Sequence, residues 1–499
     1  MDSAGSTDPA GPMDEGAARA SVAAVAHGFR AGVFAQITVQ ALRLLTNVIL
    51  ARMLVPADFG VVAVALVIIA VLEQLKDAGT GSAVIQRPEC GDRLLNSVFY
   101  LNIGLGVVLC GALFATAEPF ARLLGSAEAA GVLRALAVVS LLTATGQIHQ
   151  ALLRRSLRFG TLAWINIAST GCTTVVSIVG AALGLAYWAL ALGFAAGALL
   201  STALAWWLDP WRPGLCFDLN ALRDVLGYSG NLLLSNLAVV FYSQVDKAFV
   251  GQAFGPAAVG VFTMAQRTVI GPATGVGSVV SDVTFPAFSR RQDDDAALGN
   301  AVIRSSNAVA VVMAPALAVL AALADPLVTV LLGGQWRASV PIIVLLCPVA
   351  AVQTITKNVS QIVLAKGRSD VAFWLALAHC ALLPLAMWIG ARWGLTGAAA
   401  GYTVAVLALT PALLAVGLGL IALPCRRYLL ALLPLLAGAV IAGGCALVSS
   451  WGIEARGWGP MAQLAAGTAA AVAGYGVCLA VTRPRALDDL AGTLRARIS

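Results

Sequence analysis

Apolar stretches of about 20 residues follow one another along almost the whole chain, separated only by short polar breaks. Each stretch has the length that one α-helix needs to cross the hydrocarbon core of a bilayer. Of the 499 residues, 60% are hydrophobic and only 11% are charged, and the mean hydropathy is +0.88. Soluble domains carry roughly 25% charged residues, so this chain has too few charges to cover a water-facing surface. The sequence therefore predicts an all-α integral membrane protein.

The apolar stretches and polar breaks predict about fourteen transmembrane helices. Before them, residues 1–27 are rich in Gly, Ala, Ser and acidic side chains and lack the basic start and apolar centre of a signal peptide, which predicts a disordered cytoplasmic tail. The first six predicted helices lie near 28–50, 57–77, 94–117, 130–152, 160–184 and 186–208. The other eight lie near 226–250, 258–285, 298–323, 338–360, 369–391, 395–422, 428–449 and 458–482.

Lysines and arginines are distributed unevenly over the predicted loops. Positively charged loops are retained on the cytoplasmic side of a membrane, so their distribution indicates orientation. With the amino terminus inside, most of the 31 cations fall in inside segments, which predicts that both termini are cytoplasmic. The same bias accounts for the net charge of +7 without a nucleic-acid partner. The outside loops then hold only Arg52, Arg122, Arg337, Arg392 and Arg456.

A short pattern recurs 200 residues along the chain. Residues 56–61 and 256–261 share the pattern P-x-x-x-G-V, each at a turn between two predicted helices. Two six-helix units in the same orientation imply two pseudo-symmetric lobes with a central cavity between them. The predicted organisation is a tail (1–27), an N-lobe (28–208), a C-lobe with its preceding cytoplasmic loop (209–425), two further helices (426–482) and a cytoplasmic tail (483–499).

Several cations fall inside the predicted helices, where burying a charge at the bilayer centre costs at least about 2.5–3.5 kcal/mol. Arg43 and Arg267 sit deepest, so they must face other protein or a water-filled cavity. The others lie within about a turn of a helix end, where a long side chain can reach the headgroups, and we prefer that interpretation for them. They are Lys76, Arg134, Lys247 and Lys357.

Polar side chains form stripes on the same helices. In the first helix they recur at alternating spacings of four and three residues, which puts them on one face. Lipid would not tolerate such a face, so it predicts a hydrophilic path, with interhelical hydrogen bonding as the structural alternative. More cations than acids line this path, which suits an anionic cargo such as a diphosphate. The predicted substrate-binding residues of the cavity are Gln36, Gln40, Arg43, Asn47, Asn231, Asp246, Lys247, Arg267 and Lys357.

The chain offers little for catalysis or for binding a metal. Nine cysteines are scattered without a C-x-x-C pair, and three histidines fall in separate segments. No G-x-S-x-G, H-E-x-x-H or Walker motif is present. The sequence therefore predicts a protein that is not an enzyme and has neither a metal site nor a cofactor, with a coupling proton or sodium ion left open.

Three parts of the chain carry a resemblance to a known family. They are residues 50–60 (LARMLVPADFG) with 76–87 (KDAGTGSAVIQR), residues 150–159 (QALLRRSLRF), and residues 244–251 (QVDKAFVG) with 265–267 (AQR). Together with the number of helices, they resemble the Wzx-type polysaccharide flippases of the MOP transporter superfamily, in particular the WzxC-like lipopolysaccharide and exopolysaccharide exporters. The resemblance covers about residues 28–425, and the last two helices match nothing specific.

This resemblance implies a cargo and a direction of transport. A polyprenyl-diphosphate-linked oligosaccharide would be flipped from the inner to the outer leaflet of the bacterial cell membrane by alternating access, for cell-surface polysaccharide biosynthesis. The implied partners are this substrate, membrane lipids, and a polysaccharide polymerase and glycosyltransferases of the same pathway. An ion-coupled multidrug or metabolite extruder of the same superfamily is the first alternative. A membrane glycosyltransferase or polymerase is the second, although the outside loops are too short and too poor in ionisable groups to favour it.

Overall fold

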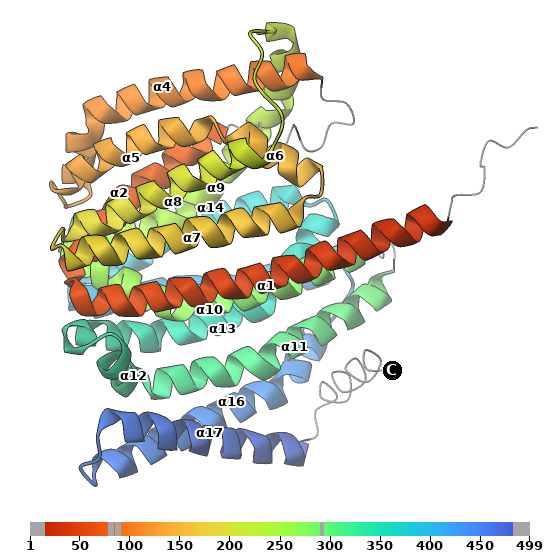
Figure 1. Ribbon diagram of the computed structural model, residues 1–499. Coiled ribbons are helices and arrows are strands. Elements are labelled where there is room, and N and C mark those ends of the chain that lie inside the picture. Colours follow the sequence, from red (N-terminus) through yellow and green to blue (C-terminus); the bar gives the residue numbers. More distant parts are fainter. Residues whose placement is uncertain (1–14, 78–83, 85–90, 290–293, 483–499) are drawn as a thin grey trace, which may run out of the picture.

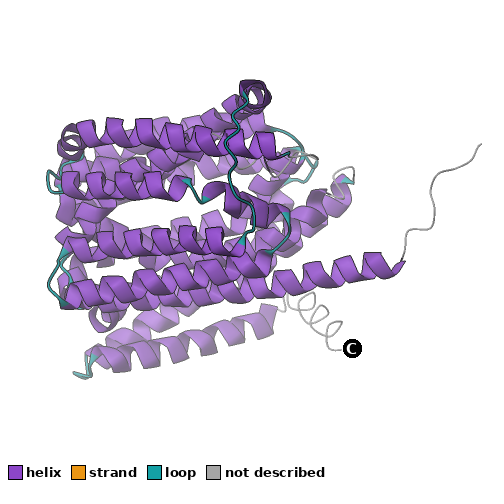
Figure 2. Ribbon diagram, turned by 45° about the horizontal axis from the view of Figure 1, so that its top comes forward, coloured by secondary structure: helices purple, strands orange, loops and turns teal. Residues whose placement is uncertain are grey.

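The computed structural model describes residues 15–77, 84, 91–289 and 294–482. Every regular element in these residues is a helix (Figure 2). The first part of the chain forms α1 (Glu15–Met53), α2 (Pro56–Asp77), α4 (Asp92–Leu123), α5 (Ala129–Ala144), α6 (Gln147–Arg155), α7 (Phe159–Ala182) and α8 (Tyr187–Leu208).

The second part of the chain forms a similar set of long helices, which run alongside those of the first part (Figure 1). They are α9 (Leu219–Phe254), α10 (Pro256–Ser289), α11 (Asp295–Ala322), α12 (Ala324–Leu331), η1 (Gly334–Ser339), α13 (Val340–Ala365), α14 (Ser369–Gly390), η2 (Ala391–Trp393), α15 (Gly394–Gly419), α16 (Cys425–Glu454) and α17 (Pro460–Thr482).

The described helices confirm the all-α membrane fold. Ten stretches are long and apolar enough to cross a bilayer, or eleven when the bent pair α5 and α6 counts as one span. One of them, Phe373–Gly419, contains α14 and α15, which turn back and pack against each other. Helices α9 and α10 are long enough, but in the described residues their polar side chains keep them below this level of apolarity. Each predicted span coincides with one helix or with the α5–α6 pair.

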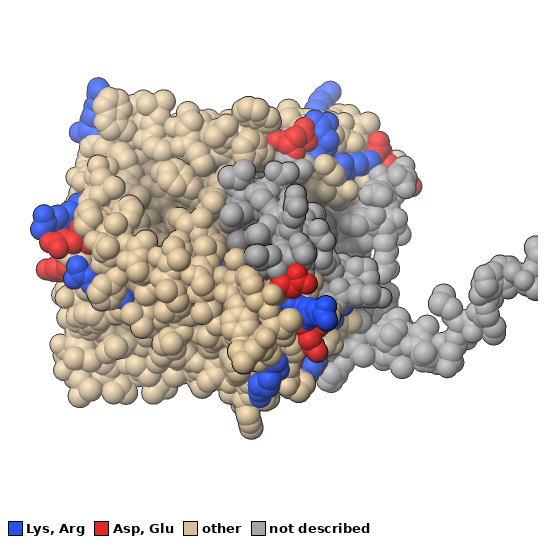
Figure 3. Space-filling view, turned by 90° about the horizontal axis from the view of Figure 1, so that it is seen from above, with Lys and Arg blue, Asp and Glu red and all other residues tan. Residues whose placement is uncertain are grey.

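The surface has the distribution of charge that a bilayer requires. Charged side chains gather toward the two ends of the helices, and a broad belt between them is almost free of charge (Figure 3). Large apolar side chains such as Trp164 and Val440 are more than two-thirds exposed in the described residues, as expected where lipid is the solvent. The start of α1 and the end of α17 lie toward the same end of the bundle (Figure 1).

Helix α1 begins at Glu15, within the segment 1–27 for which the sequence predicts a disordered tail. Residues 15–27 are rich in alanine and contain no proline or β-branched run, so their helix propensity is high once a membrane helix follows them. The rest of the predicted tail, residues 1–14, lies outside the described residues, as does the predicted tail at 483–499.

The two copies of the repeated pattern contact each other. Pro56 and Pro256 are the first residues of α2 and α10, which pack side by side. Gly60 lies against the carbonyl oxygen of Pro256, and Gly260 lies against the carbonyl oxygen of Pro56. A methyl group on either glycine would overlap the opposing oxygen, so only glycine permits this approach. The repeat therefore joins the first and second parts of the chain at one end of the bundle.

A second contact closes the same end. The buried Trp336 donates its indole N–H to the carbonyl oxygen of Ala51 at 2.8 Å, and its ring meets Phe59 edge-on. The side-chain amide of Gln335 donates to the carbonyl oxygens of Ala51 and Leu54. The last carbonyl groups of a helix have no partner within the helix, so η1 satisfies those at the end of α1. The sequence had placed α12 and η1 in a loop.

A linker at 209–218 joins α8 to α9 and is fixed at both of its ends (Figure 2). His149 Nδ1 on α6 lies 2.8 Å from the carboxylate of Asp209, and both side chains are buried. The backbone N–H of Asp218 donates to the hydroxyl of Ser97 on α4 at 2.8 Å. These bonds hold the connection between the predicted lobes against the N-lobe.

The last two helices pack on the predicted C-lobe through α11. The buried Tyr428 on α16 donates its hydroxyl to Ser306 at 3.0 Å, and Tyr475 on α17 donates to the carbonyl oxygen of Val311 at 2.9 Å. Helices α16 and α17 also pack against each other. The exact boundaries of the lobes remain a prediction.

Candidate functional site

The polar stripe of α1 faces a cavity of about 900 Å³ that lies between α1, α7, α8 and α10. Gln36, Gln40, Arg43 and Asn47 all line this cavity, as the spacing predicted. Lys357 on α13 also lines it. No carboxylate contributes to its wall among the described residues, so the fixed charges that face this space are positive.

A second cavity of about 680 Å³ adjoins the first along α10 and lies between α2, α9, α10, α13 and α15. It contains two more of the predicted residues, Asp246 and Lys247 of α9. Tyr242, Gln353 and Tyr402 are among the other polar residues of its wall. Unlike the first cavity, this one combines an acid with a cation.

Arg267 lies where the two cavities meet, because it lines both of them. Its guanidinium donates to the side-chain oxygen of Asn47 at 3.1 Å and lies 6.0 Å from the centre of the Phe59 ring. Asn47 belongs to α1 and Arg267 to α10, so this hydrogen bond crosses between the two halves of the molecule. Among the described residues, only Asn47 accepts a hydrogen bond from this guanidinium, so the planar fork can still bind an anion bidentately.

Arg43 differs from Arg267 in its surroundings. Its side chain is exposed to the first cavity, and it makes no hydrogen bond or ion pair to another described residue. It lies close enough to Arg267 for the two positive charges to repel each other. An anion placed between them would relieve this repulsion.

Asp246 is almost completely buried, with 4% of its surface exposed. One carboxylate oxygen accepts from the side-chain amide of Gln266 at 2.5 Å, and the other accepts from the backbone N–H of Lys247 at 2.7 Å. The Lys247 ammonium instead donates to Gln244 at 3.1 Å. The acid is thus held by neutral donors rather than by the neighbouring cation, although both line the second cavity.

The structure brings eight of the predicted site residues to the two cavities. The ninth, Asn231, lies on α9 in a part whose side chains are outside the described residues. The sequence favours an interpretation in which the side chains of Lys247 and Lys357 reach the lipid headgroups. In the structure, both side chains line a cavity instead. Their role in binding substrate remains a prediction.

The sequence analysis missed a row of hydroxyl groups on α7 that faces Arg43 across the first cavity. The signal was present, because these residues recur at helical spacing. It is weak, because serine and threonine in membrane helices commonly donate to their own backbone, as Thr173 and Thr174 also do here. The row consists of Ser169, Thr170, Thr173, Thr174 and Ser177.

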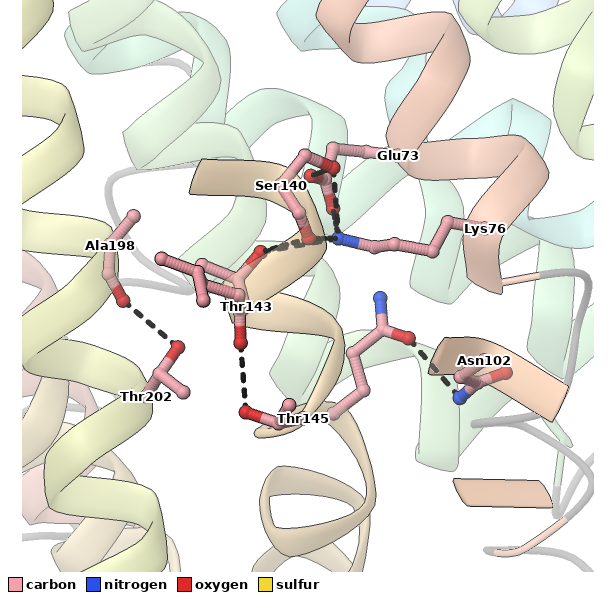
Figure 4. A network of polar contacts seen from close by, with 10 residues as sticks. Glu73, Lys76, Asn102, Ser140, Thr143, Thr145, Ala198 and Thr202 are labelled. Atoms are coloured by element: carbon pink, nitrogen blue, oxygen red, sulfur yellow. Dashed lines mark hydrogen bonds and ion pairs between the residues drawn. The ribbon is translucent and has the colours of Figure 1, made fainter. Parts of the chain in front are cut away.

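The interpretation of Lys76 is wrong. We expected it to reach the headgroups, but its side chain is fully buried between α2 and α5. Its ammonium lies 2.7 Å from the Glu73 carboxylate and donates to the carbonyl oxygen of Ser140 at 2.8 Å and to the hydroxyl of Thr143 at 3.2 Å (Figure 4). Position near a helix end allows a long side chain to leave the protein, but an acid one turn earlier and hydroxyls on the next helix offer better partners.

The sequence of this chain matches a known protein family. The sequence profile described as "Polysaccharide biosynthesis protein" matches residues 49–341, more than half of the chain. The chain belongs to this polysaccharide biosynthesis family. The resemblance to the Wzx-type flippases that the sequence analysis identified is therefore confirmed.

Family members from several bacteria are similar over most of the chain. The lipopolysaccharide biosynthesis protein WzxC of Escherichia coli is 26% identical over 386 residues, which cover 76% of this chain and 77% of WzxC. The succinoglycan biosynthesis transport protein ExoT of Rhizobium meliloti is 30% identical over 336 residues, which cover 67% of this chain and 68% of ExoT.

Solved structures share the fold of this family member. The lipid II flippase MurJ in an inward closed conformation superposes with a TM-score of 0.72 at 14% identity, over 90% of this chain and 99% of MurJ. An inward-facing multidrug resistance transporter of the MATE family superposes with a TM-score of 0.61 at 17% identity, over 78% of this chain and 98% of the transporter. At these identities the similarity establishes the fold alone.

Proposed function

We propose that this protein flips a polyprenyl-diphosphate-linked oligosaccharide from the inner to the outer leaflet for cell-surface polysaccharide biosynthesis, and that it performs no chemistry on its cargo. The observation that carries this proposal is the pair Arg43 and Arg267 in a cavity whose described lining holds no acid. Its relatives WzxC and ExoT are named for lipopolysaccharide biosynthesis and succinoglycan transport, which supports a lipid-linked saccharide as the cargo.

Each part of such a cargo has a matching part of the cavity. The diphosphate would bind between the guanidinium groups of Arg43 and Arg267, which form short, charge-assisted hydrogen bonds to phosphate oxygens. The hydroxyl row of α7 and the amides of Gln36 and Gln40 would bind the sugar hydroxyls. A diphosphate cannot cross hydrocarbon unaided, so a protein that replaces its hydration shell with fixed donors removes the main barrier.

The movement would be an alternating access of the two lobes. They are joined at one end by the reciprocal contact of Gly60 and Gly260, and in the cavity by the bond between Asn47 and Arg267. A diphosphate that competes with Asn47 for Arg267 would release this second link. Binding would thus favour a change of conformation, because the ligand interacts differently with the two states.

The membrane and partners follow from the same proposal. The protein would reside in the bacterial inner membrane with both termini in the cytoplasm, as the distribution of lysine and arginine predicts. Glycosyltransferases would supply the loaded lipid on the cytoplasmic side, and a polymerase would consume it on the outer side. Consumption of the product, or a proton or sodium gradient, would give the transport its direction.

Reconstitution tests the proposal directly. Purified protein in vesicles of phosphatidylethanolamine and phosphatidylglycerol should move a fluorescent, polyprenyl-diphosphate-linked oligosaccharide between leaflets, measured by quenching with a membrane-impermeant reductant. Protein-free vesicles and vesicles with Arg43→Gln/Arg267→Gln should not. In cells, deletion should cause a cytoplasm-facing glycolipid to accumulate, detected by mass spectrometry, and unchanged lipid pools would contradict the proposal.

The alternative of a multidrug extruder is tested by the same vesicles. A drug carrier would move an organic cation but leave the lipid-linked saccharide in place. The positive charge of the first cavity argues against it, because like charges repel a cationic drug. Faster movement of an organic cation than of the lipid-linked saccharide would favour the alternative.

A further inference from the structure

A third cavity, of about 420 Å³, shares residues with the first cavity and includes the exposed side chain of Arg154 in its wall. It lies between α1, α6 and α7, and α1 and α7 run side by side at the front of the view in Figure 1. Gln36, Arg43, Ser169 and Thr170 line both this cleft and the first cavity, so the two spaces are continuous. The wall of the cleft is partly polar: besides these four residues, Gln150, Arg154 and Asn166 contribute to it, and apolar side chains such as Val39 and Leu162 form the rest.

Arg154 stands at the outer end of this cleft. It lies in the last turn of α6, its side chain is exposed, and it makes no hydrogen bond or ion pair to another described residue. Its neighbour Arg155 donates to the carbonyl oxygen of Val84, and Arg158 donates to the carbonyl oxygen of Leu208. Those two arginines are tied to backbone and do not line the cleft, whereas Arg154 does.

The helices that form the cleft also carry exposed apolar side chains on their other faces. Phe34 and Ile37 on α1 and Trp164 on α7 are exposed by 69%, 61% and 71%, as expected for side chains in contact with lipid. These side chains sit one or two positions from Gln36 and Asn166, which point into the cleft. A molecule with a charged head and a long apolar chain could therefore hold its head in the cleft while its chain remains among the lipids.

We propose that the cleft between α1 and α7 is the entrance through which the diphosphate of the lipid-linked saccharide reaches the central cavity, and that Arg154 is the first residue to bind it. This inference rests on the proposed function. The guanidinium groups of Arg154, Arg43 and Arg267 would bind the diphosphate in turn, each step replacing one charge-assisted contact by the next. The same chemistry would bind the phosphate of an anionic phospholipid, and the experiment separates the two ligands.

The three arginines would keep the diphosphate in contact with a cation along the whole path. A diphosphate carries two or more negative charges, and moving it through a protein interior without a cation would cost several kcal/mol. Arg43 lines both the cleft and the first cavity, and Arg267 lines both the first and the second cavity. Each arginine thus stands at a passage between two spaces, and no step leaves the anion without a partner.

The test compares single substitutions in the reconstituted flipping assay, with the rate measured against the density of the fluorescent lipid-linked oligosaccharide. Arg154→Gln should raise the density needed for half-maximal rate by about tenfold, the loss expected for one charge-assisted hydrogen bond, while the maximal rate stays within about twofold. Arg158→Gln removes the same charge four residues away, in the connection between α6 and α7, and should leave both values nearly unchanged. This matched control separates the cleft from the general positive charge of the loop.

A second variant blocks the passage without changing charge. Asn166→Trp fills the cleft from an exposed position of α7, so the fold should survive, which a thermal melt in detergent would verify. The maximal flipping rate should fall at least about tenfold, because the tryptophan obstructs the entry of the lipid-linked oligosaccharide and leaves its binding residues unchanged. Ala168→Trp on the same helix, outside the lining of the cleft, is the control and should keep the wild-type rate.

Several outcomes would overturn the inference. If Arg154→Gln and Asn166→Trp flip the saccharide at wild-type rates and densities while Arg43→Gln/Arg267→Gln is inactive, the entrance lies elsewhere and the proposed function stands. If Arg154→Gln and Arg158→Gln are equally impaired, the loop acts only by its net charge. If the effect of Arg154→Gln disappears in vesicles without phosphatidylglycerol, Arg154 binds phospholipid instead. If the wild-type protein moves no lipid-linked saccharide, the proposed function itself fails.

Discussion

The two main cavities share Arg267 but differ in how their polar groups are paired. In the first cavity, between α1, α7, α8 and α10, the walls combine cations with hydroxyls and amides, and Arg43 has no partner among the described residues. In the second, Asp246 is already bound by Gln266 and by the backbone of Lys247. The first cavity thus has unused binding capacity for an anion, and the second has an acid whose hydrogen bonds are already made.

We infer from this difference a division of labour between the two cavities. Unpaired donors in a confined space are costly unless a ligand binds them, which suits the first cavity to the cargo. The second cavity holds a buried carboxylate, an oxygen ligand that a small cation can use, which suits this cavity to a coupling ion. Four substitutions test this division.

Substitution of Arg267 should have the largest effect, because this residue serves both cavities and the link to Asn47. Arg267→Gln should lower the flipping rate by about a hundredfold or more, since it removes a bidentate anion contact and the bond between α1 and α10. The measurement is the initial rate in vesicles at equal protein density. Arg267→Lys keeps the charge but loses the fork and should recover only part of the rate.

Arg43→Gln should lower the rate by about tenfold, less than Arg267→Gln, because Arg43 contributes to the first cavity and the cleft only. If both arginines bind one diphosphate, their effects are coupled, and the double variant should lose less than the product of the single losses. Independent, multiplicative losses would show that the two guanidinium groups do not share a ligand.

Asp246→Asn should change the response to ion gradients more than the rate itself. Asparagine keeps the size of the side chain and an acceptor oxygen, so the cavity should persist and flipping without a gradient should fall by only about threefold. Stimulation by an imposed proton or sodium gradient should disappear, as measured in vesicles with and without the gradient. Stimulation that survives in this variant would place the coupling site outside the second cavity.

Thr173→Val should have the smallest effect of the four. Valine matches the shape of threonine and removes only the hydroxyl, so a single sugar contact is lost and the rate should change by about two- to threefold. The change should depend on the saccharide, since a lipid diphosphate without sugars lacks the contact. Ser243→Ala in the second cavity is the matched control and should be insensitive to the sugar.

The fold was largely predictable, because in a bilayer each spanning helix must satisfy its own backbone and therefore leaves a long apolar run in the sequence. The stripe of α1 was also predictable, since Gln36, Gln40 and Arg43 recur at helical spacing. Partners were not. The burial of Lys76 depends on Ser140 and Thr143, which are distant in the sequence, and spacing along one helix carries no information about the neighbouring helix.

The hydroxyl row of α7 and the cleft beside it show the same limit. Threonine occurs both in lipid-facing helices and in cavity walls. The presence of a threonine at position 173 therefore does not reveal that this side chain lines a cavity. The helices at 324–339 were missed because eight-residue segments give too short a periodic signal, and their purpose, to cover the end of α1, is evident only from the contact of Trp336 with Ala51.

The reciprocal contact of Gly60 and Gly260 has the geometry of a twofold interface between identical subunits, although one chain supplies both sides. In such an interface each surface is its own complement, so one ancestral sequence would have been sufficient to make both partners. A duplication of such a sequence would leave the two copies free to diverge everywhere except where they still meet. We therefore expect a bulky residue at Gly60 or Gly260 to disrupt this contact, because it would meet a backbone oxygen of the opposite helix. Only shortening that opposite helix would restore the fit. A second substitution, at the other glycine, would not.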